Sequence, residues 1–341
     1  MKPTVHDIAA RAGVSLATVD RVLNGRPGVR APTREKVEAA VAELGFVRDV
    51  AAANLAKSRV YTFAFIIPAN DNSFMIGLRG ELEAVRRWAA QDRISIQLID
   101  VPAFDAEALA SALDAVRAEQ MDGVAFVAID HPHVREALER LAESGLAAVT
   151  VVSDLMNSSR AHYAGIDNLA AGRTAATLLG RFLGRRDGPI LPVAGSLQVQ
   201  DHRERLEGFQ SVLREQFPER SILPVVEGGD DPVRVEALVS QAAADHPELA
   251  GIYSFGAGNR GLIRALAAFP PGRRPVTIGH ELTSVTRAAL LAGHIDAVLN
   301  QDAGHEVRSA IRVLKAKADG AGVVVAQERI RIDIFLKENL P

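Results

Sequence analysis

The chain has 341 residues, of which 48% are hydrophobic and 24% are charged, a balance typical of globular proteins with two or three domains. No apolar run approaches the roughly 20 residues that cross a bilayer, and the charged first residues lack the apolar core of a signal peptide, so we expect a cytoplasmic protein without a membrane span. The net charge of −3 hides an asymmetry, because residues 1–59 contain ten Lys or Arg and six Asp or Glu, which leaves −7 for the remainder. This excess of +4 favours a polyanion as partner, and the absence of cysteine excludes disulfides and thiolate metal sites.

Three short helices are predicted in the first 45 residues. They span Val5–Ala12, Ser15 to about Asn24, and about Pro32 to Leu44. Ser15 is a suitable N-cap, and Gly25 and Gly45 are stop signals behind the second and third helices. Only residues 12–14 separate the first two helices, and Gly13 can adopt a positive φ there. A turn this tight joins two helices at a steep angle, which predicts a helix-turn-helix.

The second predicted helix has two different faces, because residues three and four apart share a helix face. The apolar face contains Val19, Val22 and Leu23, and it must pack on the other helices. The opposite face contains Leu16, Ala17, Asp20 and Arg21. We expect this second face to contact a partner, and the second helix of a helix-turn-helix enters the major groove of DNA.

From Val60 onward, short aliphatic runs alternate with helical patterns. The runs span 60–68, 94–100, 123–130, 147–154, 189–195, 222–228, 251–256, 275–281 and 297–302. Such runs are typical of strands that are buried on both faces of a parallel sheet and joined by helices. Nine are too many for one ordinary open sheet, so we expect an α/β body of two subdomains. The alanine-rich segment 48–59 is predicted to be a linker that becomes helical only when other contacts hold it in place.

The segment GAGNRG, Gly256 to Gly261, follows a predicted strand, and Glu281 lies about 20 residues further on. This is the pattern of a dinucleotide-binding turn with its acidic ribose partner. However, the motif belongs to the seventh strand unit rather than to the first, and Arg260 crowds the turn. A regulator that senses NAD(H) therefore stays open as an alternative function.

Catalysis finds little support in the sequence. It contains no nucleophile elbow, no HExxH motif, no phosphate-binding loop and no cysteine nucleophile. His131 and His133 flank a proline near a strand end, where a solvated loop is a simpler explanation than a metal site. We expect neither catalytic residues nor a cofactor or metal, and a sugar-modifying enzyme with a fused DNA-binding segment is a further alternative.

The stretches TVHDIAARAGVSLATVDRVLNG and VRAPTREKVEAAVAELGFV closely resemble the headpiece of the lactose-repressor/galactose-repressor family of bacterial transcription regulators, over residues 4–59. The resemblance implies double-stranded DNA as partner, with base contacts from Leu16, Ala17 and Arg21. It implies phosphate contacts from Thr4, Ser15, Thr18, Asn24 and Thr33. It also makes the linker a hinge helix in which Leu55 inserts into the minor groove.

Three positions depart from the pattern of that family. Asp20 stands where a serine is usual and would place a negative charge toward phosphate, which implies a different local geometry or base preference. Arg30 replaces a small N-cap residue before the third helix. Arg48 and Asp49 replace the usual Pro-Asn, which leaves the start of the hinge helix open.

Residues 60–341 resemble the periplasmic sugar-binding proteins, on the segments IPANDNSFM, DHRERLEGF and GIDNLAAGRTAATLLG. The resemblance implies six effector-binding residues, which are Asn72, Phe74, Asp154, Arg205, Glu281 and Gln301. Phe74 would stack on a sugar, and the polar groups would bind hydroxyls at the carboxyl ends of strands. Phe255 and Gly256 stand where that family commonly has Asn-Asp. The wall of the expected pocket is therefore more apolar at this point, unless the Asn259 amide replaces the missing polar groups. Leu155 stands where an arginine is frequent.

The sequence therefore predicts a helix-turn-helix headpiece (1–47), a hinge (48–59) and an effector-binding and dimerisation domain (60–341). The domain divides into an N-subdomain, about 60–165 and 302–328, and a C-subdomain, about 166–301 and 329–341. The expected function is a repressor that binds a palindromic operator as a homodimer and responds to a sugar, polyol or sugar acid. The last residues, RIRIDIFLKENLP, include no heptad segment for a tetramer.

Overall fold

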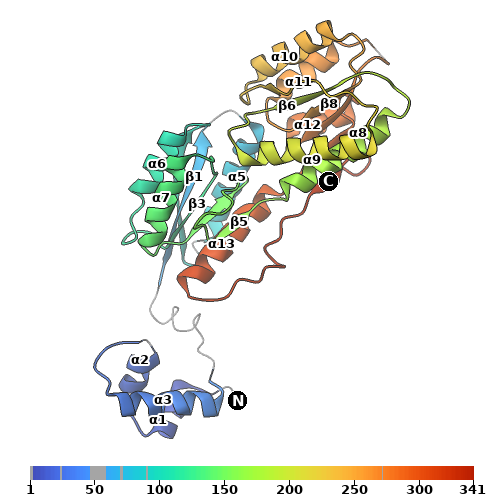
Figure 1. The fold of residues 1–341 in the computed structure, drawn as a ribbon. Helices are drawn as coiled ribbons and strands as arrows, with labels where there is room; N and C mark the ends of the chain where they lie inside the picture. Colours follow the sequence, from blue (N-terminus) through green and yellow to red (C-terminus); the bar gives the residue numbers. More distant parts are fainter. Residues whose placement is uncertain (1–2, 24, 47–58, 70–71, 90, 271) are drawn as a thin grey trace. The chain divides into compact units, whose positions relative to one another are not determined.

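The computed structural model describes residues 3–341 except 24, 47–58, 70–71, 90 and 271. Two compact units make up the chain, a helical N-terminal unit (Met1–Arg59) and an α/β body (Val60–Pro341) (Figure 1). None of the helices in the described part of the chain is long and apolar enough to span a membrane.

The N-terminal unit contains the three helices that the sequence predicts. They are α1 (Val5–Ala12), α2 (Leu16–Leu23) and α3 (Ala31–Leu44). Thr4 and Asp7 form a capping box at the start of α1, in which each side chain accepts a hydrogen bond from the backbone N–H of the other. Gly13 and Gly45 end α1 and α3 with φ values of 65° and 60°, a left-handed conformation that glycine adopts without steric cost. Arg30 precedes α3 without a side-chain capping hydrogen bond.

The core of the N-terminal unit lies where its three helices meet. Ile8, Val19 and Val37, one from each helix, are fully buried there. The partly buried residues packed around them include Val22, Leu23, Val41 and Leu44. On the other face of α2, the residues Leu16, Ala17, Asp20 and Arg21 are all exposed. The predicted division of α2 into an inward and an outward face is confirmed.

The first lobe of the body is built on a five-stranded parallel sheet of order β2-β1-β3-β4-β5. Its strands are β1 (Tyr61–Ala69), β2 (Ile94–Pro102), β3 (Gly123–Phe126), β4 (Ala148–Val151) and β5 (His162–Ala164). One face is covered by α5 (Ser73–Ala89) and α13 (Ala303–Ala318), and the other by α6 (Ala106–Ala115) and α7 (Pro132–Glu143). Each face has its own apolar core, which explains why the central strands are continuous apolar runs.

The second lobe is built on a six-stranded sheet of order β11-β10-β9-β8-β6-β7. Its strands are β6 (Ile190–Ala194), β7 (Val226–Glu227), β8 (Gly251–Ser254), β9 (Val276–His280), β10 (Ala297–Asn300) and β11 (Asp333–Phe335). One face packs on α8 (Asn168–Leu183) and α9 (Gln200–Gln216). The other packs on α10 (Pro232–Asp245), α11 (Asn259–Ala267) and α12 (Ser284–Leu291).

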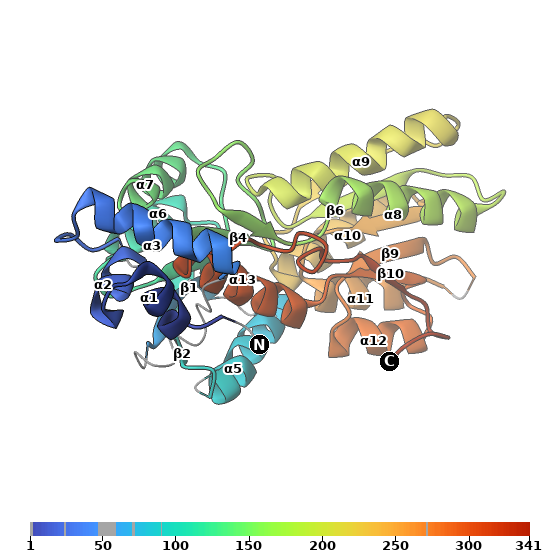
Figure 2. The same cartoon turned by 90° about the horizontal axis from the view of Figure 1, so that it is seen from below.

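The predicted α/β class with two sheets is confirmed, and the structure adds two strands, β5 and β11. Each has only three residues, too few for a hydrophobic period to be visible in the sequence. Because β11 pairs with β10 in the antiparallel direction, the second sheet is not wholly parallel, which corrects the prediction. The chain crosses between the lobes after β5, after β10 and after α13, which packs beside the strands of the first lobe (Figure 2).

Candidate functional site

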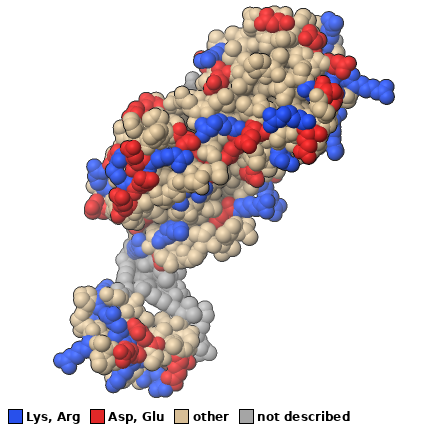
Figure 3. Space-filling model, viewed as in Figure 1, with Lys and Arg blue, Asp and Glu red and all other residues tan. Residues whose placement is uncertain are grey.

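The exposed face of α2 presents the three residues for which the resemblance implies base contacts. Leu16 has 42% of its surface exposed, and Ala17 and Arg21 are exposed beside it. On the visible face of the N-terminal unit, Lys and Arg side chains lie interspersed with Asp and Glu (Figure 3). A guanidinium can donate two hydrogen bonds to a guanine edge, and an apolar side chain can contact a thymine methyl. This face of α2 therefore has the chemistry for reading base edges.

Asp20 has a cation beside it on the same unit. Its Oδ2 lies 3.1 Å from Arg26 Nη1. Both side chains are more than half exposed, so the pair contributes little to stability. The negative charge that the sequence would direct toward phosphate is therefore partly neutralised by Arg26.

The predicted phosphate-contact residues that the structure describes are Thr4, Ser15, Thr18 and Thr33. The Thr4 hydroxyl belongs to the α1 capping box, and the Ser15 and Thr18 hydroxyls are hydrogen-bonded to each other at 3.0 Å at the start of α2. Thr33 lies partly buried in the first turn of α3. Asn24 and the predicted minor-groove residue Leu55 lie outside the described residues.

A pocket in the body lies between the two lobes. Its walls come mainly from residues at or after the carboxyl ends of β1, β2, β3, β4, β6, β7, β8, β9 and β10. Ligands of open α/β sheets bind at this end of the strands. The cavity volume is about 80 Å³. The pocket walls come from both lobes, so a small molecule bound there would contact both.

Five of the six predicted effector-binding residues line this pocket, namely Asn72, Phe74, Arg205, Glu281 and Gln301. The structure does not bring Asp154 to the pocket. The Asp154 carboxylate accepts hydrogen bonds from the Arg160 guanidinium and, at 2.7 Å, from the Thr150 hydroxyl. Ser153, one residue earlier, lines the pocket instead. Asp154 thus holds Arg160 and the loop after β4, and its predicted contact with the effector stays a prediction.

Among the described residues, side-chain hydrogen bonds join the lobes both in the pocket lining and outside it. Asn72 Nδ2 of the first lobe donates to Asp230 Oδ2 of the second at 2.8 Å. Arg203 Nη2 of the second lobe donates to Asp130 Oδ2 of the first, also at 2.8 Å. The lobes are therefore held in a closed arrangement around the pocket.

Arg205 is buried at the pocket with its guanidinium fixed in place. Its Nε donates to Asn168 Oδ1 at 2.8 Å, and its Nη1 donates to the Phe255 carbonyl at 3.0 Å. Its Nη2 lies 4.0 Å from Asp201 Oδ2 and 3.9 Å from Glu281 Oε1. Two hydrogen bonds thus position the third nitrogen between two carboxylates.

Two carboxyl groups near Arg205 have strongly perturbed acidities. Burial raises the pKa of Glu281 to about 7, and the charge of Arg205 and hydrogen bonds from Gln301 offset part of this effect. Burial, and then the charge of Glu281, raise the pKa of Glu306 on α13 well above its usual range. Near pH 7, Glu281 is therefore divided between its two forms.

Six pocket-lining side chains have a buried polar atom without a hydrogen-bond partner in the described part of the chain. These atoms are Ser153 Oγ, Asp201 Oδ1, Arg205 Nη2, Asn259 Oδ1, His280 Nδ1 and Gln301 Oε1. Buried polar groups in native proteins nearly always have a partner, so this concentration marks a place that a ligand or water completes. The set includes donors and acceptors, which suits groups that can do both, such as hydroxyls.

The backbone is strained at corresponding points of the pocket in the two lobes. Val152 directly follows β4 and has a φ of 66°, and Glu281 directly follows β9 and has a φ of 69°. A positive φ is unusual for any residue with a Cβ and most costly for a β-branched one. Phe104 in the first lobe (φ 59°) and Asp230 in the second (φ 61°) also line the pocket, so each lobe contributes two strained residues, as is common at binding sites.

The fold itself requires glycine at the three glycine positions of GAGNRG. A Cβ on Gly256 would lie 2.1 Å from the backbone nitrogen of Gly195, and one on Gly261 would lie 1.7 Å from the Pro232 carbonyl oxygen. Gly258 has a φ of 86° at the start of α11. Close backbone packing therefore explains the spacing without a bound pyrophosphate.

Phe255 and Leu155, which differ from the residues usual in the periplasmic sugar-binding proteins, pack in the interior, and Asn259 adds an amide to the pocket wall. Phe255 is fully buried, with its ring 4.9 Å from that of Tyr253 between centroids. Asn259 lines the same wall, so the wall is apolar with an amide beside it. Leu155 is buried in the core of the first lobe.

Sequence reasoning missed several polar residues of the pocket, namely Asp201, His202, Asp230 and His280. A signal for Asp201 was available, because it lies four residues before Arg205 and both therefore share one face of α9. No local pattern marks Asp230 or His280, which reach the pocket through strand order.

Comparisons with known proteins match the two units separately. Residues 4–49 match the family described as bacterial regulatory proteins, lacI family, and residues 63–322 match the family described as periplasmic binding protein domain. Catabolite control protein A of Staphylococcus aureus is 27% identical over 213 residues, and the HTH-type transcriptional regulator DegA of Bacillus subtilis is 27% identical over 216 residues. These alignments cover 62% and 63% of this chain and 62% of each relative, which is less than two thirds of the relatives' length. GanP, a glucose-galactose binding protein from Geobacillus stearothermophilus, has the same fold with a TM-score of 0.74 at 19% identity, over 83% of this chain and 99% of GanP.

Proposed function

Because the chain belongs to the periplasmic binding protein domain family over residues 63–322 and its residues 4–49 match the lacI family of bacterial regulatory proteins, we propose that it represses transcription under the control of a small neutral sugar or polyol. The N-terminal unit binds an operator, and the pocket between the lobes binds the effector. The protein acts in the cytoplasm as a homodimer, and its two-fold symmetry matches a palindromic operator.

The exposed face of α2 supports the DNA-binding part of the proposal. Arg21 supplies a bidentate donor for a guanine, and Leu16 and Ala17 supply apolar contacts to neighbouring bases. The hydroxyls of the first turns of α1 and α2 lie near the helix N-termini, where backbone N–H groups favour phosphate. The base contacts set specificity, and the phosphate contacts set position.

The six unpartnered polar atoms of the pocket are the observation that carries the effector-binding part of the proposal. Hydroxyl groups can accept from Arg205 Nη2 and donate to the oxygens of Asp201 and Gln301. The carboxyl groups of Asp201, Asp230 and Glu281 also line the pocket, and Arg205 is the one arginine among the described lining residues. This balance disfavours an anionic ligand, so a neutral sugar or polyol fits better than a sugar acid.

Closure of the lobes is the proposed connection between effector and operator. The effector stabilises one arrangement of the lobes, and that arrangement changes how the two N-terminal units of a dimer are presented to DNA. A coupling free energy of about 1–3 kcal/mol would change operator affinity about 5- to 150-fold.

The DNA part is tested with purified full-length protein in a selection from genomic duplex fragments. A palindromic site should be enriched over scrambled duplex of the same composition. Equal recovery of both would contradict the proposal, whatever ligand is present.

The effector part is tested by thermal shift with neutral hexoses and hexitols, the corresponding uronic acids, and NAD(H). A ligand at 100 times its Kd adds about 2.7 kcal/mol of stability. We expect stabilisation by a neutral compound, loss of that effect in Gln301→Ala, and no loss in Gln241→Ala, whose site on α10 lies outside the pocket. Stabilisation only by NAD(H) would favour the redox-sensing alternative, and turnover of a bound sugar would favour an enzyme.

A further inference from the structure

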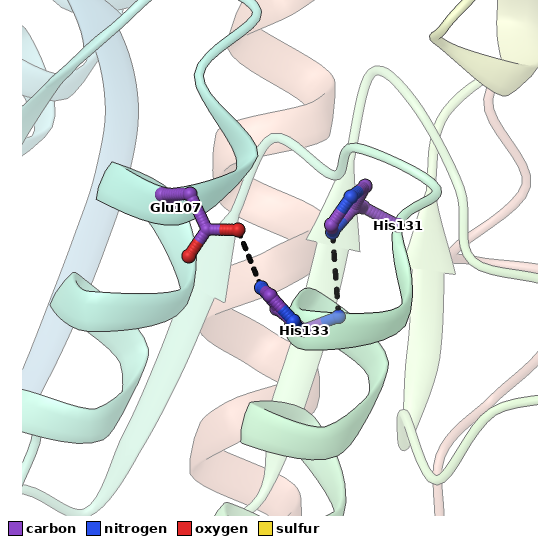
Figure 4. A group of neighbouring side chains, drawn as sticks. All are labelled: Glu107, His131 and His133. Atoms are coloured by element: carbon purple, nitrogen blue, oxygen red, sulfur yellow. Dashed lines mark hydrogen bonds and ion pairs between the residues drawn. The ribbon is translucent and has the colours of Figure 1, made fainter.

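Three side chains of metal-binding types meet on the surface of the first lobe, outside the pocket. Glu107 extends from the first turn of α6 toward His133 at the start of α7, and His131 precedes α7 (Figure 4). One ligand atom from each side chain lies within 4.8 Å of the other two. In the described part of the chain, this is the group of His, Asp and Glu side chains that meets this criterion.

The fold brings the two histidines together by the way α7 begins. His131 is the N-cap of α7, and its Nδ1 accepts a hydrogen bond from the His133 backbone N–H at 3.3 Å. Pro132 between them is the first residue of the helix and has a fixed φ, which limits the motion of the histidine backbones. The imidazole rings lie edge to face with centroids 5.0 Å apart.

Packing of α6 on α7 supplies the third group. The two helices share one apolar core on the same face of the first sheet, which fixes the distance between their first turns. The Glu107 carboxylate is already hydrogen-bonded to His133 Nδ1. Glu107 lies 26 positions before His133, so the sequence, which showed only the two histidines, gave no sign of a third group.

The donor set is that of a zinc site with open positions. Two imidazole nitrogens and one carboxylate oxygen are common Zn²⁺ ligands at about 2.0–2.2 Å, and water occupies the fourth position in such sites. Ligand atoms around one ion are then about 3–4 Å apart, so small rotations of these side chains suffice. His133 and Glu107 are 53% and 68% exposed, which leaves their side chains free to rotate and the site open to water. On binding, the cation takes the place of the hydrogen bond between His133 and Glu107, and a neutral His133 ring keeps its one proton on the nitrogen that does not bind the ion.

We propose that Glu107, His131 and His133 bind one Zn²⁺ ion at the surface of the first lobe, with water completing the coordination. The ion joins the first turns of α6 and α7. It lies beside Asp130, the residue of the first lobe that accepts from Arg203 of the second.

The test is a ZnCl₂ titration of chelator-treated, full-length protein without a histidine tag, followed by isothermal calorimetry. We expect one Zn²⁺ per chain, and about tenfold or greater loss of affinity in His133→Ala and in Glu107→Gln. The matched control is His246→Ala, because His246 is a surface histidine 3.8 Å from the single acid Glu248, and its affinity should equal that of the wild type. Circular dichroism of each variant before titration verifies that it is folded.

Two results of the titration would overturn the site. One is wild-type protein that binds no Zn²⁺ below millimolar concentration. The other is binding that persists unchanged in both His133→Ala and Glu107→Gln. A competition with millimolar Mg²⁺ adds a second readout, because imidazole ligands favour Zn²⁺ and Mg²⁺ should not displace it; displacement by Mg²⁺ would contradict a site that uses the histidines.

Discussion

Replacing Glu281 by Gln should remove a pH-dependent loss of stability. Glu281 is buried at the pocket, where its Oε1 accepts a 2.8 Å hydrogen bond from Gln301 Nε2. A glutamine at this position keeps an oxygen for that hydrogen bond but carries no charge at any pH. The variant therefore isolates the free energy of ionising one buried carboxyl group.

The magnitude follows from the pKa of Glu281, which burial raises from 4.5 to about 7. An acid whose pKa is higher in the folded state holds its proton more tightly there, so the stability that it contributes is complete below pH 4.5. That contribution falls as the pH rises from about 4.5 to about 7 and is then lost. The difference of about 2.5 pKa units corresponds to about 3 kcal/mol.

The assay is urea unfolding of the wild type and Glu281→Gln at equal protein concentration between pH 5 and pH 8. Trp88, the one tryptophan of the chain, lies on α5 in the body, so its fluorescence reports on unfolding of the body. The stability of the variant relative to wild type should increase by about 2–3 kcal/mol between pH 5 and pH 8. Titrating groups that do not interact with Glu281 occur in both proteins and cancel in the comparison, and Glu306 is the neighbour whose pKa also responds to the charge of Glu281.

A relative stability that is the same at pH 5 and pH 8 would refute this reasoning. It would mean that Glu281 ionises near its usual pKa, and hence that water or Arg205 compensates for its burial. A variant that loses stability at pH 8 would show that the attraction between Glu281 and Arg205 exceeds the cost of burying the charge.

Three further substitutions, one of them with a matched control, test other parts of the structure. Arg21→Ala should weaken operator binding by about 1–3 kcal/mol in a fluorescence-anisotropy titration and leave binding to scrambled duplex nearly unchanged, whereas equal losses would contradict a base contact. Thr4→Ala removes the cap of α1 and should cost the N-terminal unit about 1 kcal/mol, measured by thermal unfolding; no change would show that the cap is dispensable. Gly256→Ala should destabilise the body by about 1–3 kcal/mol, because its Cβ meets Gly195 nitrogen at 2.1 Å. Gly80→Ala, with open space around its Cβ on α5, should not destabilise the body, and similar losses for both glycines would contradict the packing argument.

The sequence by itself determined the elements whose signal is local. The three helices of the N-terminal unit, the outward face of α2 and the left-handed glycines after α1 and α3 all follow from neighbours within one or two helical turns. The strands of both sheets were predicted for the same reason, since a strand buried on both faces must be a continuous apolar run. The short strands β5 and β11 were missed because three residues show no period.

Only the tertiary structure decided which distant side chains meet. Asp154 follows a strand as the pocket residues do, and its carboxylate accepts hydrogen bonds from Arg160 and Thr150, which no local pattern predicts. Asp201 and His280 reach the pocket because strand order brings α9 and the end of β9 together, and Glu107 meets two histidines because α6 packs on α7. A local sequence pattern reflects how one helix or strand is buried. A binding site instead depends on side chains that are far apart in the sequence. The packing of sheets and helices determines which of these partners meet. The spacing of residues that are close in the sequence therefore does not predict them.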